Sequence, residues 1–569
     1  MPVRGQRLAD AVRRDQGDLT CQATKDIASL GHHGKYKGNL ARDFDNYCQK
    51  LELTGHLEPY LLETEIQDHR EKIVAGEAAV FVPHEVAHSL WECDEPEFSR
   101  RFGTDKLSEY WRNAEAHPWF RTHPWKAAIK RRPDRCIPVR IHGDDAPCTK
   151  RTQIFVANLS PVCTSLQSWL SRFLLVCWPL VMAAGPQTLE SFFSAFVWSL
   201  LLMAPDLDDV LFPNTGHNHQ PLRGKRLARA GQRICGGYRF VLTQFCGDWK
   251  FLKEFFHFRQ CYTKLQFCWL CLGTKAIGTL CAWNNSLDAA CFECERSSTA
   301  FLMFLRSLHH PLASYTGFDM SMIMLDLMHI CLLGIMQFVV GGVLWELCLE
   351  QRWYRPGRGS WQSRTNHSLR LAFDDFKNWL KTRQLQSSHP LFTVLGLSMH
   401  TLADCPMLKV KAANCLLVCQ WLSELCCADA HAEGDDYKKV RATTLWGFSE
   451  TFSILQGQDH WISDTAAEHL MCTRAAALQG YNTLACVAVE REINRFPTKP
   501  KIHLFDHCMR DTCKYRENPT FCWCFSDEDF IGKIKRVASR CHPFRMGMRA
   551  LQRWAMRYFA QLRNAKSGV

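Results

Sequence analysis

Three carboxylates at widely separated points of the chain could together hold divalent cations. Asp144 follows the stretch IPVRIHG, Asp248 follows GYRFVLTQFCG, and Glu528 lies in SDEDFIGKIKR. Two carboxylates at strand ends and a third from a helix can bind a pair of Mg²⁺ or Mn²⁺ ions, which activate the attacking oxygen and stabilise the leaving oxygen of a phosphodiester. Acids after strands are also common as turn residues, so each acid alone indicates little. Asp145 is an alternative to Asp144 as the first ligand.

Cysteine and histidine spacing predicts a second kind of site. Cys268 and Cys271 have the spacing of a zinc knuckle, and Asp326 and His329, three residues apart on a predicted helix, share one face. A second Cys-x-x-C pair, Cys291 and Cys294, follows at ribbon-like spacing. In a chain with 29 cysteines, however, such pairs also arise by chance, and a lone histidine is more often a core residue.

The elements around these residues follow a recognisable order. Apolar periodicity and chain breakers predict strands at 137–144, 153–160, 178–184 and 237–247, a helix at 188–203 before the fourth strand, and a helix at 249–260 after it. The first and fourth strands both end in an aspartate. This is the order of a ribonuclease-H-like fold, in which the first and fourth strands are neighbours and would bring Asp144 and Asp248 together.

The predicted fold class is α/β with a large helical part. We expect four regions: a mostly helical 1–130, the first part of a ribonuclease-H-like core with its Cys-x-x-C at 131–294, an all-α insertion at 295–498, and the end of the core with a basic helix at 499–569.

Composition excludes several classes of protein. At 569 residues, 47% hydrophobic and 22% charged, the chain is neither disordered nor fibrous. Its N-terminus lacks the apolar region of a secretory signal, so we expect an intracellular protein with reduced cysteines. Apolar stretches near 170–204 and 327–345 leave a membrane protein as an alternative, but His329 and Gln337 favour a buried helix. No P-loop or dinucleotide fingerprint occurs.

Basic residues cluster near the C-terminus. The net charge is +12, and no acid follows Asp529. Four arginines recur at every fourth position, so they share a broad helix face, and a second basic group lies in an acid-free loop; such surfaces bind phosphates without reading bases. The candidate DNA-binding residues are Arg545, Arg549, Arg553 and Arg557, and in the loop Arg223, Lys225 and Arg226.

Several motifs in one order resemble a known family. IHGDDAP, CGDWKFLKEFF, CWLC, LDLMHICLLG, KPKIHLFDH and SDEDFIG occur between residues 136 and 545. Together they resemble the catalytic core of cut-and-paste DDE transposases of the CACTA-like group. The resemblance implies that Asp144, Asp248 and Glu528 form the metal-binding triad. Glu528 precedes Gly532 by four residues, as in the family, whereas Asp145 stands where glycine is usual.

The resemblance also implies roles for the remaining motifs. In the family the Cys-x-x-C and Asp-x-x-His motifs recur together, which implies that Cys268 and Cys271 meet His329, with Asp326 beside it, at a Zn²⁺ or structural site. Lys501 and His503 would contact phosphate. The resemblance implies a nuclear protein that binds transposon-end and target DNA and forms a homo-oligomer. No association with a membrane is expected.

Three functions stay open at this level. The first is a transposase, or a transposon-derived descendant, that cleaves and joins DNA strands by metal-dependent phosphodiester transfer. The second is a catalytically inactive descendant that binds DNA or chromatin. The third, from another class, is the integral membrane protein with the two apolar stretches as spans.

Overall fold

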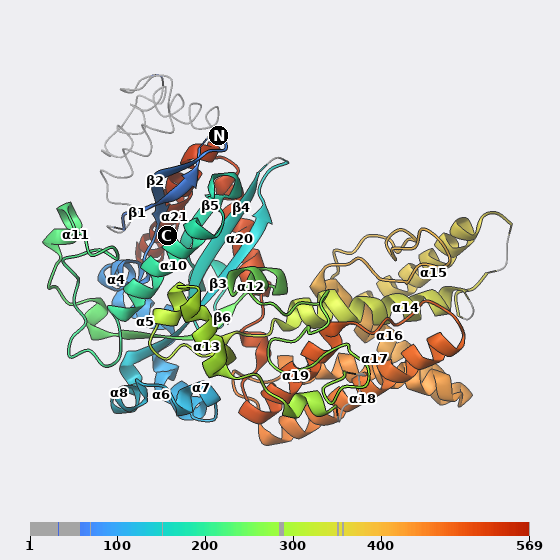
Figure 1. Ribbon diagram of the computed structural model, residues 1–569. Coiled ribbons are helices and arrows are strands. Elements are labelled where there is room, and N and C mark those ends of the chain that lie inside the picture. The colour runs from blue at the N-terminus through green and yellow to red at the C-terminus, as the bar shows by residue number, and fades with distance from the viewer. Residues whose placement is uncertain are drawn as a thin grey trace. The chain divides into compact units, whose positions relative to one another are not determined.

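The computed structural model describes residues 57–68, 70–150, 152–283, 289–349, 352–355 and 358–567, together with His32. The chain folds into two compact units, each assembled from separate stretches of sequence. Unit 1 comprises Met1–Asp105, Asp145–Phe240 and Asp529–Val569, and unit 2 comprises Lys106–Asp144 and Val241–Glu528. The chain is mixed α/β with helices predominating, as expected (Figure 1).

Unit 1 combines a hairpin, two strands of the larger sheet and several helices. The hairpin was not predicted, because the expectation for 1–130 was helical, and most of residues 1–56 lie outside the described part. Its elements are β1 (Tyr60–Gln67), β2 (Ile73–Val80), α4 (Pro83–Cys93), α5 (Glu95–Phe102), β4 (Gln153–Pro161), α9 (Ser168–Ser171), β5 (Phe173–Pro179), α10 (Pro186–Leu201), α11 (Gly224–Ala228) and α21 (Met546–Ser567).

The C-terminal helix α21 is a core helix of unit 1. Its Trp554 and Tyr558 are buried, and Tyr558 lies 5.8 Å from Phe173 of β5 while Trp554 lies 5.9 Å from Phe81. The guanidinium of Arg101 lies 4.5 Å above the Tyr558 ring. The apolar face of α21 is therefore covered, and its arginines are left on the opposite side.

Unit 2 is mainly a helical assembly. Between 295 and 498 its described residues form helices, turns and irregular connections. Its elements are α6 (Leu107–Ala114), α7 (Pro118–Arg121), α8 (Lys126–Arg131), α12 (Trp249–Phe255), α13 (Ser298–Ser307), the π-helix η9 (Met328–Ile335), α14 (Met336–Leu349), α15 (Trp361–Thr382), α16 (Ala412–Glu433), α17 (Asp436–Gln456), α18 (Asp464–Glu490) and α19 (Pro500–Tyr515).

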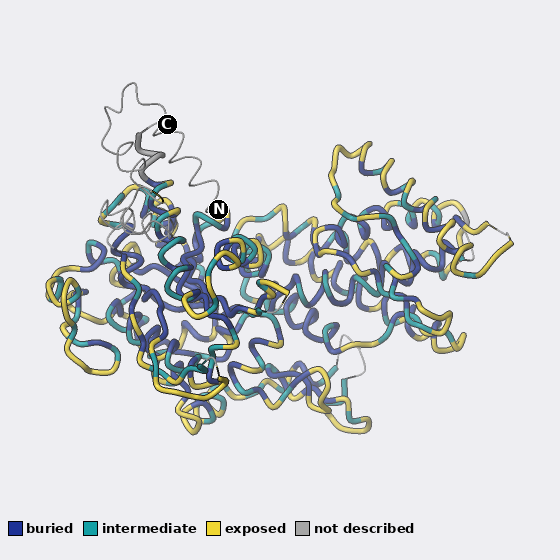
Figure 2. Tube along the Cα trace, turned by 90° about the horizontal axis from the view of Figure 1, so that it is seen from above, coloured by how far each residue is buried: buried dark blue, intermediate teal, exposed yellow. Residues whose placement is uncertain are grey.

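Long antiparallel helices form the bundle of unit 2. Helices α17 and α18 approach closely because glycines face the neighbouring helix: a Cβ on Gly447 would lie 2.5 Å from the Ala477 amide nitrogen, and one on Gly480 would lie 2.2 Å from Thr444 Oγ1. Buried residues follow the inner sides of these helices, and exposed residues follow their outer sides and loops (Figure 2).

The larger sheet has the order β5-β4-β3-β6 and includes β3 (Cys136–Pro147) and β6 (Arg239–Cys246). Its first and fourth strands along the chain are neighbours, as expected. The third strand is wrongly placed by the sequence pattern: β5 ends at Pro179, and 180–182 form a short 3-10 turn instead of continuing the strand. The apolar run from 173 to 184 is continuous, so periodicity alone did not locate its break.

Within the part of the chain that the structure describes, one helical stretch, Met328–Leu349, is long and apolar enough to cross a membrane, with a mean hydropathy of 1.9. In the structure 83% of its most apolar part is buried inside the protein. The other stretch, 170–204, is divided into strand β5 and helix α10. These observations agree with the interpretation of 327–345 as a core helix.

Candidate functional site

Strands β3 and β6 are each associated with a Gly-Asp pair. Gly247-Asp248 directly follows β6, whereas Gly143-Asp144 lies within β3, which continues to Pro147 instead of ending at Asp144 as expected. Thr243 Oγ1 lies 3.5 Å from the Val139 carbonyl oxygen, and a Cβ on Gly247 would lie 3.2 Å from the Gly143 carbonyl oxygen. Both pairs of neighbours are 104 residues apart in sequence, and a constant difference in residue number means that the two strands run parallel. Asp144 and Asp248 differ by the same number, so they follow matching positions of neighbouring strands.

The two glycines are required by the ring of Phe251. A Cβ on Gly143 would lie 2.4 Å from this ring, and one on Gly247 would lie 2.5 Å from it. Phe251 is held there by helix α12, whose N-cap is Asp248. The Oδ1 atom of Asp248 accepts a hydrogen bond of 2.7 Å from the Phe251 amide. Asp248 thus has a fixed orientation before any ligand binds.

Glu528 is held by a histidine that is itself held by a buried aspartate. His329 Nε2 lies 3.3 Å from Glu528 Oε1, and His329 Nδ1 donates to Asp326 Oδ2. Asp326 is buried, and its Oδ1 accepts from the amides of Met328 and Cys524, each at 3.1 Å. Glu528 lies in the first turn of α20 (Phe525–Ala538).

The charges in this group support one another. Burial alone would lower the pKa of His329, but hydrogen bonds and charges from Asp326 and Glu528 outweigh it and raise that pKa to about 10. Burial would raise the pKa of Asp326, yet the hydrogen bond from His329 keeps it below its ordinary value. His329 is therefore an imidazolium between two carboxylates at neutral pH.

Lys501 connects this group to Asp248. Its Nζ donates a 2.7 Å hydrogen bond to the His329 carbonyl oxygen, inside the π-helix η9. Burial lowers the pKa of the Lys501 ammonium, while the negative charges of Asp326 and Asp248 act against that shift. Gly334 leaves room for the side chain, because a Cβ there would lie 2.6 Å from Lys501 Cδ. In this structure the Lys501 ammonium is directed at protein groups and not outward, where it could contact a DNA phosphate.

The carboxylate donors suit Mg²⁺ or Mn²⁺, because hard cations prefer oxygen ligands and Mg²⁺ keeps several waters. Among the described residues, two other groups of side chains have all their ligand atoms within 4.8 Å of one another, and the triad is not such a group. One of them is Asp326, His329 and Cys524. Because Asp326 already accepts two amides and the imidazolium, this group is a hydrogen-bonded unit and not an open metal site.

The second group is a Cys₂His₂ cluster made by Cys268, Cys271, His503 and His507. Cys271 Sγ lies 3.2 Å from His503 Nε2, and all four residues are buried. The zinc expectation therefore needs a correction: the structure places His503 and His507 beside the cysteine pair, whereas His329 and Asp326 lie in the other group. The spacing C-x₂-C with H-x₃-H is typical of zinc sites, so it could have been found from the sequence.

The surroundings of the Cys-x-x-C turn fit a bound thiolate pair. The Leu270 amide donates to Cys268 Sγ at 3.4 Å, and the Gly273 amide donates to Cys271 Sγ at 3.3 Å. Without a metal, hydrogen bonding with Cys268 and burial raise the pKa of the Cys271 thiol, and the Gly273 amide acts against that shift. A Cβ at Gly273 would lie 3.2 Å from both Cys271 Sγ and His503 Cε1. Burial lowers the pKa of His503 and His507, which favours the neutral, metal-binding imidazole.

His503 therefore does not contact DNA phosphate in this structure, because its side chain is fully buried. It is enclosed by the rings of Phe267 and Phe292, at 5.0 and 4.7 Å. Among the described residues, His507 Nε2 has no hydrogen-bond partner although it is buried, and a metal bound at that nitrogen would explain this.

The second Cys-x-x-C pair does not form a separate four-cysteine ribbon. Cys291 lies beside Cys271 and His503, and hydrogen bonding with Cys271 raises the pKa of its thiol. Cys294 instead lies beside Cys281. The two cysteines of the pair thus point to different neighbours.

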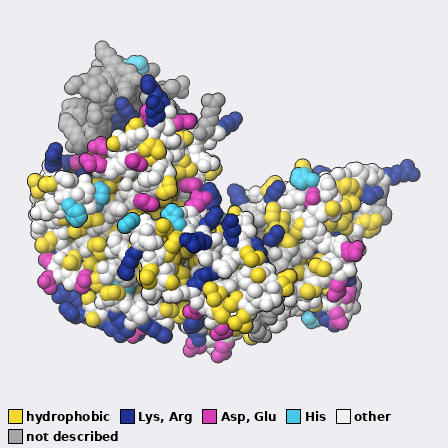
Figure 3. Space-filling view, in the orientation of Figure 1, with side chains coloured by type: hydrophobic (Ala, Val, Ile, Leu, Met, Phe, Trp, Pro, Cys, Tyr) yellow, Lys and Arg dark blue, Asp and Glu magenta, His cyan; other side chains and the backbone are white. Residues whose placement is uncertain are grey.

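The predicted basic surfaces belong to unit 1 and differ from each other. Arg545, just before α21, and Arg557 within it are exposed, while Arg549 donates to Gln552 and Arg553 to the Arg540 carbonyl oxygen, at 3.3 and 3.1 Å. Lys and Arg side chains gather in several groups on the face seen in Figure 3 and not in one stripe.

The basic loop is largely neutralised within the fold. Arg226 makes two hydrogen bonds to Glu85, at 2.6 and 2.9 Å, and Lys225 Nζ lies 2.9 Å from Glu58. Arg223 is exposed. The expected DNA-binding role of Lys225 and Arg226 therefore competes with ion pairs that fix α11 on the N-terminal part of unit 1.

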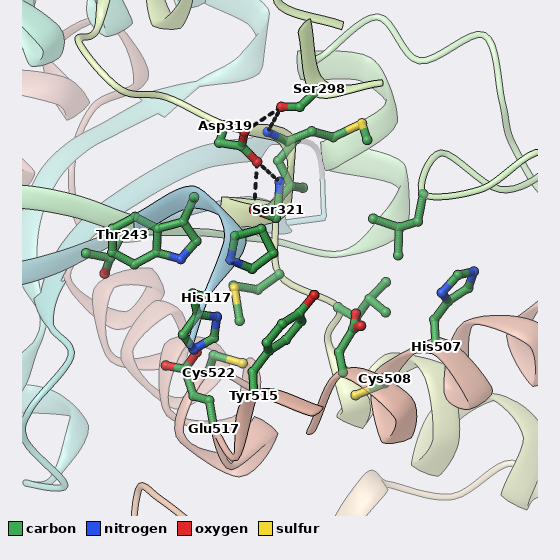
Figure 4. Close-up of a pocket in the computed structure, with 18 of the residues that line it drawn as sticks. His117, Thr243, Ser298, Asp319, Ser321, His507, Cys508, Tyr515, Glu517 and Cys522 are labelled. Atoms are coloured by element: carbon green, nitrogen blue, oxygen red, sulfur yellow. Dashed lines mark hydrogen bonds and ion pairs between the residues drawn. The ribbon is translucent and has the colours of Figure 1, made fainter. Parts of the chain in front are cut away.

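A cavity of about 390 Å³ also lies in unit 2. Figure 4 shows His117, Tyr515 and Glu517 on one side of it and Asp319 with its serine partners on the other. Inside the wall, Glu517 lies 3.2 Å from His117 Nε2 and 3.1 Å from His460 Nε2. Sequence reasoning did not single out this cavity, whose residues come from distant segments.

Comparison with known proteins gives no assignment: no family model matches the chain, and neither does any curated protein.

Proposed function

We propose that the chain is a DDE-type DNA strand transferase, or a transposon-derived descendant of one, that cleaves and joins phosphodiesters with Mg²⁺ or Mn²⁺. The observation that carries the proposal is the parallel register of β3 and β6, because it puts Asp144 and Asp248 after matching positions of neighbouring strands. Carboxylates arranged in this way are suited to a shared metal site.

A ribonuclease-H-like core is part of this proposal. Supporting it are the strand order β5-β4-β3-β6, which corresponds to 3-2-1-4 along the chain, and the helical segments between Asp248 and Glu528. The antiparallel pairing of β4 with β5 and the parallel pairing of β3 with β6 also agree with such a mixed sheet. Fold and site therefore point to the same chemistry, by analogy.

Each residue would have a distinct task. Asp144, Asp248 and Glu528 would bind the cations, which activate the attacking oxygen and stabilise the leaving one. The attacking oxygen belongs to water in the cleavage step and to a DNA 3′-hydroxyl in the joining step. His329 orients Glu528 and stays protonated, so it is a positioning residue. Lys501 adds a positive charge that interacts with both Asp248 and Asp326 and thereby reduces the repulsion among carboxylates.

The Cys₂His₂ cluster would be a structural zinc site in this protein. It joins the turn after α12 to helix α19, which carries Lys501 as well as both histidines. Four protein ligands leave no open position for catalysis, so the expected contribution is to folding. The partners implied are DNA and further copies of the chain, and the implied compartment is the nucleus.

The experiment is a nicking and strand-transfer assay with the full chain, labelled duplex DNA and Mg²⁺ or Mn²⁺. Asp144→Asn, Asp248→Asn and Glu528→Gln should each reduce product formation by about 100-fold or more, because a ligand carboxylate is lost. The matched controls are Asp145→Asn and Asp529→Asn, which neutralise the adjacent acids and should retain activity. Equal loss in controls and triad variants would contradict the assignment.

One observation favours the inactive descendant as a second candidate. Asp248 already has a structural task as the N-cap of α12, and Glu528 is paired with His329, so both acids have reasons to persist without catalysis. In this case the wild-type chain binds duplex DNA with the usual salt dependence but produces no nicks with either metal.

A further inference from the structure

An exposed apolar loop extends from the Cys-x-x-C turn of unit 2. Residues 262–280, which we name the knuckle loop, carry five exposed large apolar side chains: Tyr262 (52% exposed), Leu265 (60%), Leu272 (43%), Ile277 (98%) and Leu280 (80%). A single exposed apolar residue is ordinary, but a group of five in one short loop indicates an interaction surface.

The knuckle loop is ordered by its own hydrogen bonds. The Lys275 amide donates to the Leu265 carbonyl oxygen at 2.9 Å, and Gln266 and Thr274 form an antiparallel bridge. Lys275 Nζ donates to the Tyr262 carbonyl oxygen at 2.6 Å. Cys268 and Cys271 of the Cys₂His₂ cluster lie within this loop and are buried, so the exposed side chains are presented on a fixed support.

The charge of this segment has one sign. No acidic residue occurs between Glu254 and Asp288, whereas Arg259, Lys264 and Lys275 are present and exposed. Glu295 forms a backbone bridge with Cys271 at the base of the loop, and its carboxylate lies 3.9 Å from Lys514 Nζ. A basic, apolar surface of this kind fits a polyanion that also offers apolar contact.

The loop begins next to a proposed catalytic aspartate. Trp249, the residue after Asp248, contacts the ring of Tyr262 at 5.5 Å and that of Trp269 at 5.4 Å, both edge to face. Trp269 lies between the two cysteines of the Cys-x-x-C turn. A duplex that presents a phosphate to Asp248 would therefore pass close to the knuckle loop.

We propose that the knuckle loop is a DNA-contact surface, with Lys264 and Lys275 on backbone phosphates and Ile277 and Leu280 inserted as a wedge between base pairs. This inference rests on the proposed function and adds where the duplex is held. Apolar wedges unstack a base step and bend the duplex, which gives a strand-transfer site access to a distorted phosphodiester. An anionic membrane surface shares part of this chemistry, but the contact with Trp249 beside Asp248 favours DNA.

The test uses the full chain, Ca²⁺ in place of Mg²⁺, and a duplex carrying 2-aminopurine, whose fluorescence rises on unstacking. Ile277→Ser/Leu280→Ser should abolish the fluorescence rise and weaken binding on the order of tenfold, with the salt slope unchanged. Lys264→Gln/Lys275→Gln should reduce the salt slope by about 0.9 for each lysine. Leu395→Ser/Leu402→Ser, which removes two leucines exposed by 65% and 59% elsewhere in unit 2, should behave as wild type.

The outcomes separate two failures. Wild-type protein that does not bind the duplex contradicts the proposed function and this inference together. If the wild type binds the duplex and both loop variants show the same salt slope and the same fluorescence rise as the wild type, the inference alone is overturned. If the loop binds phosphatidylserine vesicles and does not respond to DNA, the proposed DNA contact is replaced by a membrane contact. The zinc content of each variant shows whether the Cys₂His₂ cluster is intact.

Discussion

His329 Nε2 lies 3.3 Å from Glu528 Oε1, while the opposite ring nitrogen of His329 is bonded to the buried carboxylate of Asp326. This relay connects a fully enclosed acid to a half-exposed one and gives Glu528 a fixed direction. The relay is the part of the site whose geometry is most completely defined by hydrogen bonds, and its members can be changed separately.

Asp326→Asn should destabilise the protein by about 3 kcal/mol, because it leaves the imidazolium of His329 without its buried counter-ion. Urea unfolding of wild type and variant measures the change. The control Asp529→Asn breaks an exposed pair with Lys533 and should cost less than about 1 kcal/mol. Equal effects of the two substitutions would contradict the relay.

Gly247→Ala should destabilise unit 2 by about 1 to 3 kcal/mol, because the added methyl would lie 2.5 Å from Phe251 Cδ1. The double variant Gly247→Ala/Phe251→Leu should recover part of the loss, since the smaller side chain removes the clash. Thermal unfolding of the single and double variants checks this coupling. Additive effects of the two changes would show that the glycine is not required by the ring.

Purified protein should contain about one zinc ion per chain, held by the Cys₂His₂ cluster. Cys271→Ser and His507→Asn should each lose the metal and lower the thermal midpoint by several degrees, because binding free energy contributes to folding. Cys294→Ser, which changes a cysteine directed at Cys281, should keep the zinc. Elemental analysis that finds zinc in His507→Asn but not in His329→Asn would restore His329 as the ligand.

The stabilising contribution of Glu517 should be lost in acid. Burial would raise its pKa, but hydrogen bonds and charges from His460, His117 and Gln244 hold that pKa below its ordinary value. A carboxylate with a lowered folded-state pKa adds stability above its unfolded pKa of about 4.5 and loses it as pH falls through the folded pKa. Glu517→Gln should therefore flatten the decline in stability below about pH 4.5, measured by thermal unfolding across pH; an unchanged acid limb would argue against the pairing.

The approximate positions of β3, β4 and β6 were predictable from sequence because these are short β-prone runs next to chain breakers, although β3 continues past Gly143-Asp144 to Pro147. The pairing of the first and fourth strands came from fold analogy. The position of β5 was not predictable, since 173–184 is apolar throughout and only Pro179 separates strand from turn. The hairpin β1–β2 was missed because YLLETEIQ and IVAGEAAV alternate weakly and contain several helix-compatible residues.

The choice of histidine ligands depended on long-range packing. His329 was favoured by its motif, but the turn at Cys271 meets His503, 232 residues later, through helix α19. His329 instead turns toward Glu528, 199 residues later, because Asp326 fixes its ring. Local spacing identifies which residues could bind a metal, whereas the partner is decided by how helices pack around the turn.

The shared carboxylate site can be tested with a crystal of the full chain soaked in Mn²⁺ and measured at an anomalous wavelength. We predict anomalous density among the carboxylates of Asp144, Asp248 and Glu528, and its absence in Asp248→Asn. Density confined to Asp326, His329 and Cys524, or no manganese near Asp144 and Asp248, would contradict a metal site shared by the three acids.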